Sequence, residues 1–115
     1  MPLTKEVFDS TVAVLQGVRP VTWRKMFGGA GFYVDGVFFA LLDDDRLFFK
    51  VDDHSKGEYE ERGMEPWVWD GNVSDAYREL PEEIMASDEQ LGLWIDEAVQ
   101  AAIRRKSKTK TKKSK

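Results

Sequence analysis

Residues 24–53 read RKMFGGAGFYVDGVFFALLDDDRLFFKVDD, and this stretch decides the fold. Its apolar runs are interrupted by two short polar segments, Asp35-Gly36 and Asp43-Asp44-Asp45. Asp-Gly between apolar runs is a strong hairpin signal, because both central residues of a type I′ turn need a positive φ. The stretch therefore predicts three consecutive antiparallel strands joined by two tight turns.

Counting outward from the two turns gives the pairing of these strands. With Asp35 and Gly36 as the first loop, Val34 faces Val37, and with residues 43–45 as the second loop, Leu42 faces Arg46. Side chains alternate faces along a strand. One face then collects only apolar side chains, and we expect it to be the core face: Ala30, Phe32, Val34, Val37, Phe39, Leu41, Leu47, Phe49 and Val51. The outer face is mixed and carries an aromatic patch: Gly31, Tyr33, Phe38, Ala40, Leu42, Arg46, Phe48 and Lys50.

The rest of the chain supplies helices and further strands. Apolar spacing predicts a helix over 4–17 and, after a capping box that begins at Ser87, another helix from 88 onward. Shorter signals predict a first strand at 23–27, a helix from 52 or 53 to 62, strands at 67–69 and 74–80, and a short helix beginning at Pro81. Gly28 and Gly29 predict a joint before the second strand, with Gly31 just beyond it. The order α-β-β-β-β-α-β-β-α-α predicts an α+β two-layer sandwich, an antiparallel sheet with helices mainly on one face.

Charge divides the 115 residues into two parts. Residues 1–103 hold 9 Lys/Arg and 21 Asp/Glu, a net charge of −12, whereas residues 104–115 hold 8 basic residues and no acid. We therefore predict one globular domain over 1–103 and a disordered basic tail over 104–115. Either the tail only solubilises the domain, or it attracts nucleic acid through counterion release without sequence preference. The residues that would make such contacts are Arg104, Arg105, Lys106, Lys108, Lys110, Lys112, Lys113 and Lys115.

Catalytic and metal-binding patterns do not emerge from the sequence. The chain has no cysteine, and its one histidine, His54, has no partner at a recognisable catalytic spacing. Residues 43–45 lack the alternate spacing of a calcium loop. Residues 28–31 precede a strand, whereas a phosphate-binding glycine loop opens a helix. We therefore expect a protein that is not an enzyme and that uses no metal and no cofactor.

The sequence also bears on location. No apolar run approaches the ~20 residues that a membrane-spanning helix needs. The N-terminal residues MPLTKE lack the basic and apolar regions of a signal peptide. We expect a cytoplasmic protein with no membrane partner.

The segment from Met26 to Leu41, followed by LFFKVD at 47–52, resembles the N-terminal domain of the TfoX (Sxy) family of bacteria. Pro66-Trp67 and YRELPEE at 77–83 fit as well, so the resemblance covers nearly all of residues 3–103. It implies a two-layer α+β fold and a non-enzymatic regulatory role with a protein partner, here as a stand-alone single domain. Full-length members carry a second, C-terminal domain and regulate natural competence together with a transcription activator.

Helices on one side of the sheet would leave its outer face open. Exposed apolar patches usually have partners, and aromatic centres with charged rims are typical of interfaces. We therefore expect a two-fold homodimer formed through Tyr33, Phe38, Ala40, Leu42 and Phe48. Two alternatives stay open. Later segments of the same chain could cover this face, or the domain could bind a small ligand near residues 28–31 and the tryptophans Trp67 and Trp69.

Overall fold

The computed structural model describes the backbone of residues 4–26 and 28–113, with the side chains of these residues as far as Ser107. Within these residues, six strands form one open antiparallel sheet in the order β1-β2-β3-β4-β6-β5, and four helices accompany it. The predicted α+β class and element order are confirmed. In chain order the elements are α1 (Lys5–Gln16), β1 (Val21–Met26), β2 (Gly29–Val34), β3 (Val37–Asp43), β4 (Arg46–Lys50), α2 (Lys56–Glu61), β5 (Pro66–Trp69), β6 (Asn72–Glu79), α3 (Glu82–Met85) and α4 (Asp88–Lys113).

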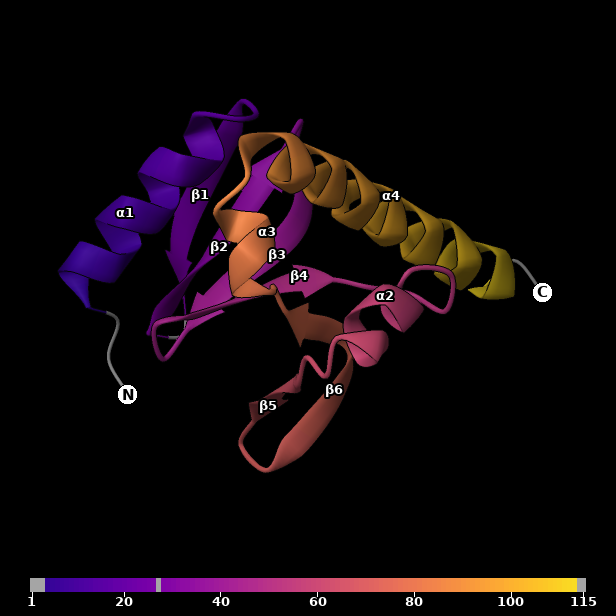
Figure 1. The fold of residues 1–115 in the computed structure, drawn as a ribbon. Helices are drawn as coiled ribbons and strands as arrows, with labels where there is room; N and C mark the ends of the chain where they lie inside the picture. The colour runs from indigo at the N-terminus through magenta and orange to yellow at the C-terminus, as the bar shows by residue number, and fades with distance from the viewer. Residues whose placement is uncertain (1–3, 27, 114–115) are drawn as a thin grey trace.

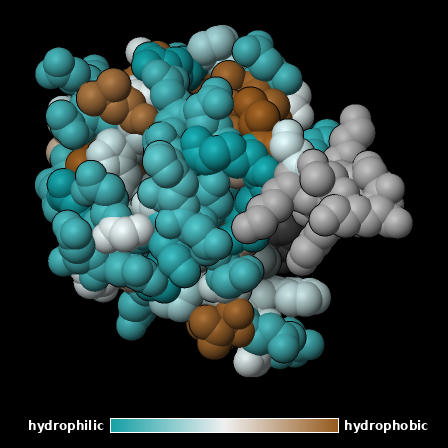
Figure 2. Space-filling model, turned by 90° about the vertical axis from the view of Figure 1, so that its right-hand side faces the viewer, coloured by the Kyte–Doolittle hydropathy of each residue, from teal (hydrophilic) through white to brown (hydrophobic). Residues whose placement is uncertain are grey.

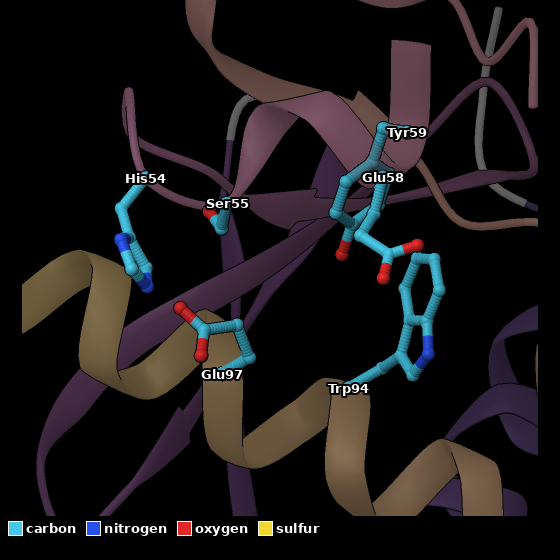
Figure 3. Close-up of a pocket in the computed structure, with 6 residues that line it drawn as sticks. All are labelled: His54, Ser55, Glu58, Tyr59, Trp94 and Glu97. Atoms are coloured by element: carbon cyan, nitrogen blue, oxygen red, sulfur yellow. The ribbon is translucent and has the colours of Figure 1, made fainter. Parts of the chain in front are cut away.

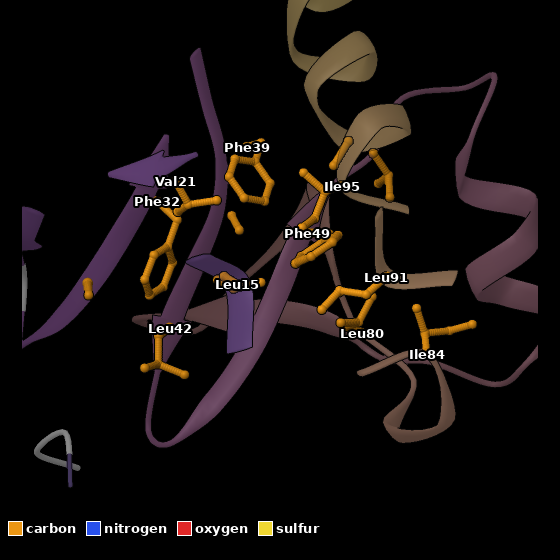
Figure 4. Close-up of a cluster of buried hydrophobic side chains, with 14 of the residues drawn as sticks. Leu15, Val21, Phe32, Phe39, Leu42, Phe49, Leu80, Ile84, Leu91 and Ile95 are labelled. Atoms are coloured by element: carbon orange, nitrogen blue, oxygen red, sulfur yellow. The ribbon is translucent and has the colours of Figure 1, made fainter. Parts of the chain in front are cut away.

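Helices α1, α3 and α4 cover one face of the sheet, and the β5–β6 hairpin extends away from them (Figure 1). Their apolar side chains meet the strands in a single core, part of which Figure 4 shows. Phe32, Phe39 and Phe49 are fully buried at its centre, and the rings of Phe39 and Phe49 pack edge to face with centroids 5.4 Å apart. The predicted core face of β2 and β4 is therefore the face that the helices cover.

Both turns of the 24–53 stretch are two-residue turns. Asp35 and Gly36 have φ values of 51° and 78°, and they are the two residues predicted for the first turn. The second turn differs from the prediction, because only Asp44 and Asp45 form it, with φ values of 53° and 60°. Asp43 instead pairs with Arg46 as the last residue of β3.

A β-bulge in β3 corrects the predicted faces. Tyr33 pairs with Phe38 as expected, but Phe32 pairs with Ala40, so Phe39 is the extra residue. Phe39 and Ala40 both point into the core, and alternation restarts from there. Ala40 and Leu42 are consequently buried in the core, with 0% and 1% of their surface exposed. Their predicted place on the outer face was wrong, as was the predicted place of Leu41 in the core, since Leu41 packs on the outer side.

At the joint between β1 and β2, the backbone turns at Gly28 and then passes close to the backbone of β3 at Gly29. Gly28 has a φ of 79°, which glycine adopts without strain. A Cβ atom on Gly29 would lie 2.0 Å from the carbonyl oxygen of Leu42, so β2 can approach β3 here only with glycine.

Candidate interaction surface

The outer face of the sheet carries a chain of five aromatic rings. Tyr33 stacks on Phe38 with centroids 5.2 Å apart, and Phe38 lies 6.0 Å from Tyr77. Trp67 packs edge to face on Tyr77 at 5.8 Å and stacks on Trp69 at 6.3 Å. These rings come from β2, β3, β6 and β5, so strand pairing alone aligns them across the sheet. We call them the aromatic row.

Beneath part of this row lies a small second core. Leu41, Phe48 and Tyr77 are 1%, 2% and 7% exposed, and Trp67 and Phe38 pack against them. Phe48, which we expected at the centre of a dimer interface, is thus covered within its own chain. The alternative that later segments fold over this face holds for this part of it, because the β5–β6 hairpin supplies Trp67 and Tyr77.

Two cations lie against aromatic rings on this face of the sheet, one over Phe48 and one over Tyr77 of the aromatic row. The Arg46 guanidinium lies 5.3 Å from the Phe48 ring centroid and donates to Glu79 at 2.7 Å and to Glu65 at 3.1 Å. The Lys50 ammonium lies 4.5 Å from the Tyr77 ring centroid and donates to its hydroxyl at 3.0 Å. Burial lowers the pKa of Lys50, and the nearby Arg105 lowers it further.

The tip of the β5–β6 hairpin is the exposed end of this surface. Val68, Trp69 and Val73 are 53%, 55% and 67% exposed, and Val68 and Val73 form a cross-strand pair. Trp67, one residue further back, is held by its indole N–H, which donates to Asp43 at 2.9 Å. Figure 2 shows a mostly hydrophilic side of the molecule, with a hydrophobic patch near the bottom, at the height of this hairpin tip.

The glycine joint and the tryptophans do not form one ligand platform. Gly28 and Gly29 line a cavity of about 600 Å³ together with Phe8 and Met26. Trp67 and Trp69 lie on β5, at the opposite edge of the sheet from β1. The structure therefore separates residues that a small-ligand site would have needed to combine.

The start of the predicted basic tail belongs to the globular domain. Arg104 donates to both carboxylate oxygens of Asp52, at 2.6 and 3.1 Å, and also to Glu97. Arg105 donates to the carbonyl oxygens of Val51 at 2.6 Å and Asp75 at 2.8 Å.

The predicted boundary at residue 104 consequently falls inside α4, which continues to Lys113. The prediction of disorder was wrong for Arg104 and Arg105, because the body of the domain holds both side chains. The side chains of Lys108, Lys110, Lys112 and Lys113, and all of Lys115, lie outside the described residues.

Comparison with known families adds to this geometry. The TfoX N-terminal domain model matches residues 13–102. This chain belongs to the TfoX N-terminal domain family. No curated protein matches it. The match includes the whole aromatic row and the hairpin tip, and it stops before Arg104.

Membership in the TfoX N-terminal domain family supports a regulatory or interaction role in general terms, and this is not a known enzyme family. Within residues 4–26 and 28–113, the helices are too short or too polar to cross a membrane.

Sequence reasoning missed how the surface is divided into buried and exposed parts. Tyr77 received no role, although it is the ring that joins Phe38 to Trp67. No local pattern indicates this, because the position of Tyr77 depends on the pairing of β6 with β4, which places Tyr77 opposite Lys50. The exposure of Val73 has no signal either, since an apolar residue in a strand usually predicts burial.

Proposed function

We propose that this domain is a non-enzymatic interaction module of a regulatory kind, which binds a protein partner through the aromatic row and the hairpin tip. The observation that carries this proposal is the exposure of Val68, Trp69 and Val73 next to a rigid aromatic base. Apolar side chains on a tight hairpin gain from leaving water, and tryptophan and tyrosine are enriched at the energetic centres of interfaces.

The charged groups around this surface suit the rim of an interface. The charged groups of Arg46 and Lys50 lie over the aromatic rings of Phe48 and Tyr77. Burial raises the pKa of Tyr77 to about 12, so its hydroxyl stays neutral and able to donate at physiological pH. An apolar centre with a polar rim is the usual composition of a specific interface.

A homodimer is the partner we propose to test first, with Tyr33 and Phe38 at one end of the interface and Trp69 and Val73 at the other. Replacing both Trp69 and Val73 by glutamate should convert a dimer into folded monomers, because it places two charges on an exposed apolar tip. Sedimentation velocity at tens of micromolar measures the change. The control is Leu93→Glu, since Leu93 is 57% exposed but lies on α4, away from the hairpin.

A wild-type protein that sediments as a monomer would remove the homodimer and leave a different protein as the partner. In that case the domain is immobilised, and capture by the wild type is compared with capture by the double glutamate variant. A protein retained equally by both would contradict binding through the hairpin tip. Phe48→Glu is unsuitable for this purpose, because Phe48 is buried and its replacement would unfold the domain.

We also propose that the basic end of the chain gives weak, unspecific affinity for nucleic acid. Because the body of the domain holds Arg104 and Arg105, the six lysines from Lys106 to Lys115 are the ones that would contact phosphates. The logarithm of the affinity for duplex DNA should then fall with the logarithm of the salt concentration with a slope no steeper than about −5.

Deletion of residues 106–115 should abolish this DNA binding and leave the melting temperature unchanged, because the contacts of Arg104 and Arg105 are kept. Fluorescence anisotropy at several salt concentrations, together with a thermal melt, measures both quantities. Binding by the shortened chain would place the contacts elsewhere and contradict the proposal.

A further inference from the structure

A cavity between α2 and α4 combines acidic groups with aromatic rings. It has a volume of about 280 Å³, the size of a small molecule, and is distinct from the aromatic row. Figure 3 shows Tyr59 and Glu58 reaching into it from the α2 side and Trp94 and Glu97 from α4. The remaining lining residues are His54 and Ser55.

The hydroxyl group of Tyr59 is the unusual feature of this cavity. Tyr59 is only 3% exposed, and its ring packs edge to face against Trp94 with centroids 4.8 Å apart. Figure 3 shows its oxygen directed into the cavity, and the hydroxyl makes no hydrogen bond to any residue in the described part of the chain. No fully buried side-chain nitrogen or oxygen of the described residues lacks a hydrogen-bond partner, so this unpaired hydroxyl reaches the solvent in the cavity. A ligand in the cavity would replace water as the hydrogen-bond partner of this hydroxyl.

The charge around the cavity favours a cation. The carboxylates of Glu58 and Glu97 line it, and the carboxylate of Asp52 contacts the lining residue Ser55. The guanidinium groups nearby are those of Arg62 and Arg104, and both are already paired with carboxylates. Glu58 makes no ion pair within the described residues, so one carboxylate at the cavity is uncompensated.

The rings decide what kind of cation fits. The Arg62 guanidinium lies 5.1 Å from the centroid of the Trp94 ring, so this indole already attracts one organic cation. Aromatic faces favour organic cations, ammonium groups included, over small metal ions, because a small metal ion does not give up its water to them. The Tyr59 ring beside Trp94 extends the same apolar wall.

We propose that this cavity binds a small organic cation with a primary ammonium group, whose N–H groups donate to the Glu58 carboxylate and the Tyr59 hydroxyl while its carbon chain lies along Trp94. Glu97 is the second carboxylate at the cavity, and Arg104 fixes its position. A site of this kind would let a metabolite control the packing of α2 against α4. It is independent of the protein-binding role proposed above.

The test is a titration of the ¹⁵N-labelled protein with n-butylammonium chloride at constant ionic strength, followed by NMR. The indole N–H signal of Trp94, assigned with Trp94→Phe, should shift in a saturable way. The indole signals of Trp23, Trp67 and Trp69 lie outside the cavity and serve as internal references. Butan-1-ol and butyrate, which have the same chain length without the positive charge, should give no saturable shift.

Two variants locate the contacts. Glu58→Gln and Tyr59→Phe should each weaken n-butylammonium binding about tenfold, because the first removes the negative charge that attracts the ammonium group and the second removes a hydrogen-bond acceptor. Glu61→Gln is the matched control: it removes the same charge from α2 outside the cavity and should leave the affinity within about twofold. The melting temperature of Tyr59→Phe should not fall, since the lost hydroxyl has no partner in the domain.

The proposal is overturned if the Trp94 signal does not saturate with n-butylammonium. It is also overturned if butan-1-ol binds equally well, or if Glu61→Gln weakens binding as much as Glu58→Gln. These results leave the protein-binding proposal untouched, because the hairpin tip shares no residue with the cavity.

Discussion

Replacing Phe39 by alanine should lower the free energy of unfolding by about 3–5 kcal/mol, the cost of truncating a fully buried aromatic side chain. Phe39 has no exposed surface, and its ring packs on Phe49. As the extra residue of the bulge in β3, it also occupies a place that the strand cannot fill from a neighbouring position. A domain of this size is stable by only about 5–15 kcal/mol. Urea unfolding should therefore show a large fall in the midpoint.

Phe38→Ala is the control for this result. Phe38 has the same side chain and stands next in the same strand, but it lies on the outer face and is only half-buried. Its truncation should cost clearly less than that of Phe39. Equal costs for the two variants would mean that the two faces of β3 are not assigned correctly.

The bulge explains why the sequence predicted β2 and β4 better than β3. Residues 37–42 read VFFALL, so every position is apolar and no alternation of polar and apolar residues fixes the register. The three aspartates at 43–45 equally do not reveal which two of them turn. The prediction missed the extra residue of the bulge, and it counted one residue too many in the second turn. Each error shifts the alternation of faces by one residue, so together they cancel, and Phe49 was still assigned to the core.

The candidate surfaces depend on contacts between distant parts of the chain, which local patterns do not contain. Phe48 is covered by the β5–β6 hairpin, which reaches it because β6 pairs with β4. The sequence pattern does not contain this pairing, so Phe48 was expected to be exposed. The cavity of Tyr59 needs α2 and α4 side by side, and no periodicity in either helix predicts that. Asp-Gly pairs, by contrast, act within four residues: Asp35-Gly36 forms the predicted turn, and Asp70-Gly71 likewise has two positive φ values between β5 and β6.

The basic tail also has contacts with distant parts of the chain that its composition does not reveal. Composition distinguishes an acidic part of the chain from a basic end, but it treats all eight cations of that end alike. Arg104 and Arg105 differ from the lysines because their guanidinium groups can donate several hydrogen bonds in a fixed plane. Arg104 donates to both oxygens of one carboxylate, and Arg105 donates to two backbone carbonyl oxygens.

Replacing Arg104 by methionine should destabilise the domain at pH 7 by about 1–2 kcal/mol, after allowance for screening by solvent. Methionine keeps an apolar stem and removes the guanidinium group. Asp52 is then left with Ser55 as its hydrogen-bond partner, although its carboxylate is largely buried. Thermal melts of the variant and the wild type measure the difference. Lys106→Met is the control, because Lys106 is exposed on the same helix.

The pH dependence of this difference identifies its cause. The hydrogen bonds from Arg104 are the main reason why the pKa of Asp52 falls from 3.8 to about 2. A carboxyl group with a depressed pKa stabilises the folded state above its unfolded pKa, and this contribution is lost as the pH falls through the folded value. The gap in melting temperature between wild type and Arg104→Met should therefore be full above about pH 4 and close by about pH 2. A gap that persists unchanged at pH 2 would show that the ionised Asp52 carboxylate is not the cause of the difference.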